Sequence, residues 1–283
     1  MKIVVLSDVH GNLPALQAIL ADLDDFDPDQ IVFAGDFTRG PFPNEVIDLL
    51  SEWNTHMILG NGDHSLLRYL DGQVPQEWRT CQQFGMLRWT ARRLTLANAL
   101  FLRSLPEQRS LALPGADAIL VVHGSPRKSS ESLSPNDLLA LDHALESSPH
   151  PVLVCGHTHL QWSLRRNEKL VINPGAVAGT VTGPRAQYAR MNWDGRQWQV
   201  DLRTVGYNLA ALQQAFEDSG LLTEGGPLAR GFLLTMETGT DFMIAFLHHA
   251  YHVARQNGWQ GGPAVPDELW QQAMDTFCWD LPK

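Results

Sequence analysis

The chain has few cysteines and no long apolar run, and each shortage excludes a class of protein. Three cysteines, Cys81, Cys155 and Cys278, are too few and too scattered for a disulfide framework, so reduced thiols are the simplest interpretation. The apolar stretch near the N-terminus, residues 3–6, is too short for a signal peptide and far below the length of a membrane span. No later stretch reaches that length either. We therefore expect a cytoplasmic protein with no membrane partner.

Basic residues are also scarce, because 21 lysines and arginines face 31 aspartates and glutamates, which gives a formal net charge of -10. A protein that binds polymeric nucleic acid through its phosphates usually presents a basic face, so DNA or RNA is not expected as the main partner. Small anionic substrates are not excluded, because bound cations can reverse the local field. With 283 residues, of which 44% are hydrophobic, the chain can bury a sizeable core in one large domain or two small ones.

Two patterns of secondary structure follow one another along the chain. Apolar β-branched runs alternate with helical patterns in the first part, whereas the strands after residue 155 follow one another without helices. The predicted strands are residues 3–6, 31–34, 57–59, 110–113, 118–122, 152–155, 170–172, 187–192 and 197–205. The predicted helices follow Asn12, cover residues 45–53, fill much of 78–105, start near Ser134 and occupy 242–255 behind a Thr240 or Asp241 cap.

This order of elements predicts a layered α/β fold with mixed sheets. The pattern becomes helical again from Gly206 onward. We therefore expect a core domain of residues 1–205 and a helical C-terminal extension of residues 206–283 that packs on it.

Acidic, amide and imidazole side chains recur at the carboxyl ends of the predicted strands. The set is Asp8, His10, Asp36, Asn61, His123, His157 and His159. Sheets of α/β proteins place their sites at this edge, and most of these residues have a neighbouring glycine, which permits tight turns and close approach to a ligand. Two carboxylates, one amide and four imidazoles form a mixed donor set that suits Mn, Fe, Zn, Co or Ni better than Ca or Mg. The sequence therefore predicts a transition-metal site.

No single motif of this set would justify a site alone. An Asp-x-His pair is common by chance, and Gly-Asp and Gly-Asn-Gly-Asp usually form turns. The Gly-His-Thr-His segment is more specific, because His157 and His159 lie two apart in an extended segment and can reach neighbouring metals. The order of the motifs, their strand-end placement and their glycines carry the prediction together.

In this order the motifs resemble the calcineurin-like metallophosphoesterases. The matching segments are Asp8-x-His10-Gly11-Asn12, Gly35-Asp36, Gly60-Asn61, His123-Gly124 and Gly156-His157-x-His159, supported by Gly40-Pro41-x-Pro43-Asn44-Glu45 and Asn173-Pro174-Gly175-Ala176-Val177. The resemblance covers residues 1 to about 205 and looks most like the bacterial and archaeal phosphodiesterase (YfcE-like) branch. It implies a four-layer αββα sandwich of two mixed β-sheets.

The resemblance also implies two divalent transition-metal ions, with manganese favoured and Fe, Zn, Ni or Co as alternatives. Asp8, His10 and His159 would hold the first ion, Asn61, His123 and His157 the second, and Asp36 would bridge them. It implies direct attack of a metal-bridging hydroxide on a small phosphodiester or phosphoanhydride, with no covalent enzyme intermediate.

One position departs from the family pattern. Many members have a histidine directly after the metal-binding asparagine, which helps to protonate the leaving group, but here that position is Gly62. Without a general acid, cleavage should favour groups that leave easily, such as phosphoanhydrides and aryl esters. We hypothesise that Asp63 or His64 partly fills the role. Asn12 and Arg39 are candidate phosphate contacts, with a helix cap and a solvated loop arginine as the alternatives.

Other functions remain open from the sequence. Within the enzyme class, the chain would be a hydrolase of dinucleoside polyphosphates such as diadenosine tetraphosphate, or a phosphomonoesterase. In another class, it would be a non-catalytic protein-binding scaffold of the same fold, although the seven candidate ligands are all present. His248 and His252 lie four apart but lack a third ligand at useful spacing. Trp78 and Trp89 belong to a segment that could border the site and stack a base. The sequence does not set the oligomeric state.

Overall fold

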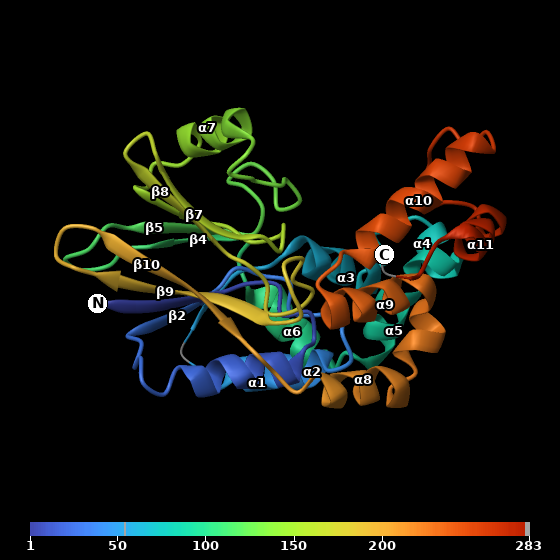
Figure 1. The fold of residues 1–283 in the computed structure, drawn as a ribbon, viewed down its shortest axis with the longest axis horizontal. Coiled ribbons are helices and arrows are strands. Elements are labelled where there is room, and N and C mark those ends of the chain that lie inside the picture. The colour runs from blue at the N-terminus through green and yellow to red at the C-terminus, as the bar shows by residue number, and fades with distance from the viewer. Residues whose placement is uncertain (54, 281–283) are drawn as a thin grey trace.

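Two five-stranded sheets form the centre of the computed structural model, which describes residues 1–53 and 55–280 (Figure 1). The first sheet contains β1 (Lys2–Leu6), β2 (Gln30–Phe33), β3 (His56–Met57), β9 (Ala186–Trp193) and β10 (Trp198–Val205). The second contains β4 (Gln108–Leu111), β5 (Ile119–Val122), β6 (Val152–Val154), β7 (Gln161–Arg166) and β8 (Lys169–Pro174). The strand orders are β10-β9-β1-β2-β3 and β4-β5-β6-β8-β7. Both sheets are mixed, because β1-β2-β3 and β5-β6-β8 are parallel and their outer neighbours are antiparallel.

Helices cover the outer face of each sheet. The helices α1 (Leu13–Asp22), α2 (Pro43–Ser51) and α6 (Leu96–Ser104) lie against the first sheet, and α7 (Leu138–Glu146) lies against the second (Figure 1). Asn12 begins α1 as predicted, since its side-chain oxygen accepts a hydrogen bond from the backbone N–H of Ala15 at 3.1 Å.

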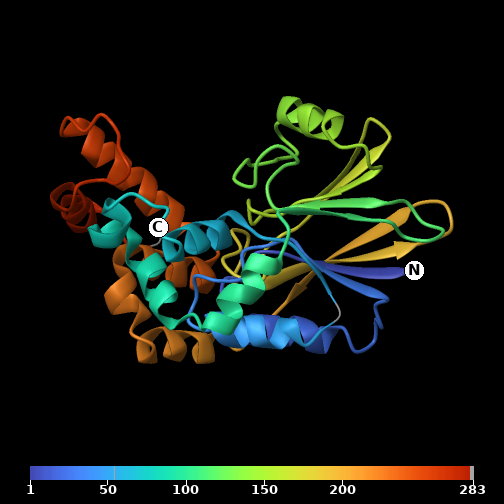
Figure 2. The same ribbon diagram turned by 180° about the vertical axis from the view of Figure 1, so that it is seen from behind.

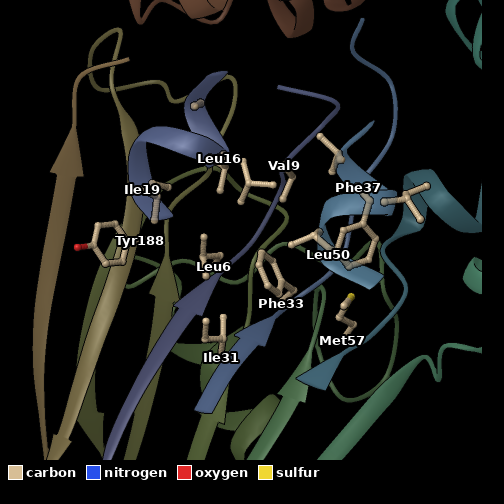
Figure 3. Packing of buried hydrophobic residues seen from close by; sticks show 14 of the residues in the cluster. Leu6, Val9, Leu16, Ile19, Ile31, Phe33, Phe37, Leu50, Met57 and Tyr188 are labelled. Carbon is tan, nitrogen blue, oxygen red and sulfur yellow. The ribbon is translucent and has the colours of Figure 1, made fainter. Parts of the chain in front are cut away.

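Three apolar clusters fill the spaces between the four layers. Side chains of a strand alternate between its two faces, so Val4 and Leu6 of β1 pack toward α1, with Leu6 and Leu16 seen together in Figure 3. Ile3 and Val5 instead pack against the second sheet. A third cluster lies between the second sheet and α7. The structure thus confirms the predicted four-layer αββα sandwich of mixed sheets.

Further helices gather at the end of the sandwich away from the N-terminus (Figures 1 and 2). They are α3 (Asn61–Leu70), α4 (Glu77–Thr80), α5 (Gly85–Arg93), α8 (Leu209–Asp218), α9 (Leu221–Thr238), α10 (Phe242–Gln256) and α11 (Asp267–Thr276). Met86 and Trp89 of α5 share an apolar cluster with Phe232 and Met236 of α9. The C-terminal helices are therefore packed on the core. A domain boundary between residues 205 and 206 remains a prediction.

Three local expectations differ from the structure. The stretch 78–105 is not one helical run, because the backbone becomes extended at Cys81 and again at Leu94. The segment Gly60–Asp63, whose pattern taken alone usually forms a turn, caps and begins α3 instead. The edge strand β7 was not predicted, because Gln161–Arg166 contains only two apolar residues, Trp162 and Leu164. No helix among the described residues combines the length and apolar character needed to cross a bilayer.

Candidate metal centre

The loops that follow β1 and β2 are joined by backbone hydrogen bonds beyond the ends of the strands. The backbone N–H of Asp8 donates to the carbonyl oxygen of Gly35 at 2.9 Å, and that of His10 donates to the carbonyl oxygen of Asp36 at 3.0 Å. Gly35 has a φ of 92°, and a Cβ placed there would lie 2.5 Å from the nitrogen of Gly60. This position therefore requires glycine, both for its left-handed backbone and for the close approach of the next loop.

Asp8, His10 and His159 form one group of converging side chains. The Nε2 atoms of His10 and His159 lie 3.2 Å apart. Asp8 Oδ1 lies 3.4 Å from Nε2 of His159 and 3.7 Å from Nε2 of His10. The geometry meets the requirement for a shared cation, with ligand atoms all within 4.8 Å of one another.

His123 is the centre of a second group. Its Nε2 lies 3.0 Å from Oδ1 of Asn61 and 3.6 Å from Oδ2 of Asp36. The ring of His157 packs edge-on against His123 with centroids 5.3 Å apart. Asp36 Oδ2 is also 3.8 Å from Nε2 of His10, so this carboxylate lies between the two groups. Asp8, Asp36 and His123 likewise meet the geometry of a cation site.

Three of the imidazoles are oriented by backbone carbonyls, as metal-binding histidines commonly are. The Nδ1 contacts are His10 to Thr38 oxygen at 3.1 Å, His123 to Ala34 oxygen at 2.6 Å and His159 to Gly179 oxygen at 2.8 Å. When Nδ1 carries the proton and donates it to a backbone carbonyl, Nε2 keeps a free lone pair, which here is directed into the cluster. The buried Asp8 Oδ1 has no hydrogen-bond partner among the described residues. Inward lone pairs and an orphaned carboxylate oxygen fit a divalent cation.

Left-handed backbone conformations are concentrated at this cluster. Nine non-glycine residues of the described chain have positive φ, and six of them belong to the site loops. They are Asp8 (56°), His10 (43°), Asp36 (58°), Arg39 (86°), His157 (67°) and His159 (56°). Each such conformation costs about 1–3 kcal/mol and persists where the surrounding structure imposes it, which is common at functional sites. The rest of the fold therefore stabilises loops that are strained locally.

The charges of the cluster are strongly coupled. Burial lowers the pKa of His10 to about 4. Burial also opposes a charge on His159, but the adjacent Asp8 carboxylate overrides it and raises the pKa of His159 to about 9. Burial acts to raise the pKa of Asp8, yet His159 and His123 hold it well below its usual range. Without a cation, a proton on His159 therefore balances Asp8, and a divalent cation would take over that role.

Comparison with known proteins identifies the family. The model of the calcineurin-like phosphoesterase superfamily domain matches residues 1–196. The chain belongs to this superfamily. It is 26% identical over 226 residues to an uncharacterised protein from Methanocaldococcus jannaschii, covering 73% of this chain and 88% of that one.

Two solved structures are similar to this chain over most of its length. A metallophosphoesterase from Sphaerobacter thermophilus is 29% identical with a TM-score of 0.65, covering 80% of this chain and 98% of that one. A hypothetical protein from Pyrococcus horikoshii is 19% identical with a TM-score of 0.67, covering 84% of this chain and 98% of that one, and supports the fold alone.

Asp63 organises the loops of the candidate metal centre. Its fully buried carboxylate accepts hydrogen bonds from the backbone N–H groups of Asp36 (2.9 Å), Phe37 (3.1 Å) and Gly60 (3.1 Å), and from the Thr38 hydroxyl (3.2 Å). Burial and the negative charge of Asp36 raise the pKa of Asp63 to about 7. These four donors indicate a positioning residue, in place of the general acid hypothesised from the sequence.

His64 and Asn12 also have contacts other than those hypothesised. His64 Nε2 lies 3.4 Å from the Glu107 carboxylate, and neither His64 nor Asp63 lines the cleft at the cluster. The side chain of Asn12 is buried, caps α1 and donates to the sulfur of Met236 at 3.7 Å. The contacts of Asn12 favour the capping interpretation over a phosphate contact. A catalytic role for His64 remains a prediction without structural support.

Gly62 makes room for Arg39 beside the cluster. A Cβ at position 62 would lie 2.9 Å from Nε of Arg39 and 2.9 Å from Oδ1 of Asp36. The Gly62 N–H donates to that same Oδ1 at 2.7 Å. A histidine at this position would therefore displace the arginine. The sequence showed that a histidine is missing here, but not that a cationic side chain occupies the space.

The C-terminal helices supply part of the site that no motif indicated. A cleft of about 500 Å³ opens on His10, Asp36, Asn61, His157 and His159. Its other wall includes Phe232 and Thr235 of α9 and Met243 of α10. The Phe232 ring contacts His10 edge-on, with centroids 5.4 Å apart. These residues lie more than 70 positions after His159, the last candidate ligand, and carry no local sequence signal.

Proposed function

We propose that the chain is a dimetal phosphoesterase that hydrolyses phosphodiester or phosphoanhydride bonds of small substrates, and that it acts in the cytoplasm. The observation that carries the proposal is the orphaned Asp8 Oδ1 surrounded by three imidazole Nε2 atoms whose Nδ1 atoms are already engaged. Asp8, His10 and His159 would hold one cation, Asn61, His123 and His157 the other, with Asp36 between them. Manganese is the metal that the family resemblance favours, and Fe, Zn, Ni or Co suit the same mixed set of carboxylate, amide and imidazole donors.

When bound, two such cations would lower the pKa of a bound water and neutralise phosphate oxygens. The residues of the chain orient the candidate ligands and bind the substrate. The carbonyls of Thr38, Ala34 and Gly179 keep the imidazoles in one orientation. Asp63 fixes the loop that carries Asp36. Arg39 lines the cleft and has no hydrogen bond or ion pair to another described residue, so its guanidinium is free to bind a phosphate oxygen.

The supply of protons to a leaving group is restricted in this cleft. Apart from the candidate ligands and Arg39, the only titratable side chain among the described residues that line it is Asp241. One of its oxygens already caps α10 by accepting from the Ile244 N–H at 3.1 Å. Cleavage should therefore favour leaving groups that need no protonation, which are aryl esters and phosphoanhydrides.

A substrate screen of the manganese-loaded protein tests this proposal. We expect turnover of bis-p-nitrophenyl phosphate and diadenosine tetraphosphate. β-Glycerol phosphate, which has an alkyl leaving group, should react more slowly by on the order of 10²-fold or more. The screen should include p-nitrophenyl phosphate and cyclic nucleotides. Equal rates on alkyl and aryl esters would overturn the leaving-group argument. No turnover of any substrate, with both cations bound, would leave the scaffold function as the better explanation.

Replacing Arg39 with glutamine should lower kcat/KM for bis-p-nitrophenyl phosphate by about 10- to 100-fold, because a hydrogen bond to a charged group contributes about 1.5–3 kcal/mol. Lysine at this position should restore part of the loss, since it keeps the charge but not the planar fork. Steady-state kinetics on manganese-loaded protein provide the measurement. Arg68→Gln, an exposed position on α3, is the matched control. Unchanged kinetics in Arg39→Gln would make Arg39 a solvated loop residue.

A further inference from the structure

A second cavity, of about 190 Å³, adjoins the candidate metal centre and shares His10, Arg39, Phe232 and Met243 with the cleft. One wall is formed by the segment 78–87, which contributes Trp78, Phe84 and Leu87. The opposite wall is formed by Leu228 of α9 and Leu247 of α10. The cavity therefore lies between the core domain and the C-terminal helices.

Apart from the Trp78 indole N–H, the polar side chains at this cavity are already engaged, with one exception. Gln83 accepts from the Val265 N–H at 3.0 Å and donates to the Tyr251 hydroxyl at 3.3 Å. Ser65 donates to the carbonyl oxygen of Asn61 at 2.9 Å. The exception is Arg39, which lines both cavity and cleft and has no partner among the described residues. An occupant should therefore be apolar along its length and anionic at the end near Arg39.

The walls are suited to a flat ring. The rings of Trp78 and Phe84 are stacked, with centroids 4.7 Å apart and an angle of 19° between their planes, and both are only partly buried. Aromatic faces of this kind favour stacked or edge-on contact with another ring. In another protein, an apolar cavity of roughly 150 Å³ takes up benzene, so about 190 Å³ suffices for one aromatic ring.

We propose that this cavity is a subsite for a flat aromatic ester group of the substrate, whose phosphate lies at the candidate metal centre beside Arg39. The inference rests on the proposed function and makes aryl phosphate esters the favoured members of its substrate class. The C-terminal helices then take part in substrate selection, because α9 and α10 provide one wall of the subsite.

Two small phosphonates test the subsite without depending on turnover. Phenylphosphonate and methylphosphonate carry the same anionic group and differ in the ring, and their Kd values for manganese-loaded protein can be measured by titration calorimetry. Phenylphosphonate should bind at least about tenfold more tightly, because the ring leaves water for an apolar cavity. Its binding should also quench tryptophan fluorescence through Trp78.

Filling the cavity should remove this preference selectively. In Leu247→Trp we expect the Kd of phenylphosphonate to rise to that of methylphosphonate, whose own Kd stays unchanged. Leu228→Trp repeats the test from the other helix, and the exposed Leu139→Trp on α7 is the matched control. Manganese content and Tm show which variants are folded. Equal Kd values in the unmodified protein would overturn the subsite alone, whereas no binding of either phosphonate with manganese bound would overturn the proposed function with it.

Discussion

Replacing Asp36 with asparagine should lower the hydrolysis of bis-p-nitrophenyl phosphate by on the order of 10³-fold, the largest effect expected of any single substitution. Asparagine preserves the shape of the side chain and keeps one oxygen that can accept a hydrogen bond from the Gly62 N–H. In the unmodified protein, that N–H donates to Oδ1 of Asp36 at 2.7 Å. It removes the negative charge that lies 3.8 Å from Nε2 of His10 and 3.6 Å from Nε2 of His123. The loss should therefore come from weaker cation binding and not from misfolding.

Three measurements separate these causes. Steady-state kinetics give the loss of turnover, elemental analysis gives the manganese bound per chain, and thermal unfolding of the metal-free protein reports the fold. Asp24→Asn, which replaces an exposed aspartate two residues after α1, should behave like the unmodified protein. Full activity in Asp36→Asn would contradict the placement of this carboxylate between two cations.

Asp63→Ala should lower the free energy of unfolding by about 3–5 kcal/mol. The substitution leaves three buried backbone N–H groups and the Thr38 hydroxyl without an acceptor, and each unsatisfied buried donor costs about 1–3 kcal/mol. The total loss of stability is smaller than the sum of the four donors' costs, because water can enter the vacated space and accept some of their hydrogen bonds. Because one of the donors is the Asp36 N–H, manganese binding should weaken as well.

Urea unfolding of the metal-free protein measures this effect. Asp63→Asn keeps one acceptor oxygen and should lose less stability than Asp63→Ala, which separates lost hydrogen bonds from lost charge. Asp201→Ala, an exposed carboxylate on β10, is the control for removing charge from the surface. A change of less than about 1 kcal/mol in Asp63→Ala would show that its four hydrogen bonds do not organise the loops.

Local sequence patterns were sufficient to predict most of the sandwich and the gathering of the candidate ligands. Apolar β-branched runs mark β1 and β2, and Asn12 with Pro14 marks the start of α1. Each candidate ligand lies within five residues after the end of a strand, so the parallel strands themselves bring Asp8 and Asp36 to one edge. Such features depend on neighbours in the sequence, and for this reason they can be read from it.

Features that depend on distant contacts were not predictable in this way. The inward direction of Asp63 follows from α3 starting at Asn61, which places its carboxylate under the loop after β2. The need for glycine at position 62 becomes clear only in the folded chain, where Arg39 occupies the space that a side chain would fill. The wall formed by Phe232 and Leu247 requires the C-terminal helices to fold back over the site. Only the folded chain brings these groups together.

The central claim is that seven side chains hold two divalent cations, and anomalous diffraction from crystals of the manganese-loaded protein tests it most directly. Data collected on either side of the manganese absorption edge should show two peaks flanking Asp36 Oδ2. One peak should lie among Asp8, His10 and His159, and the other among Asn61, His123 and His157. An anomalous map without a peak at these residues, from crystals that contain manganese elsewhere, would contradict the account.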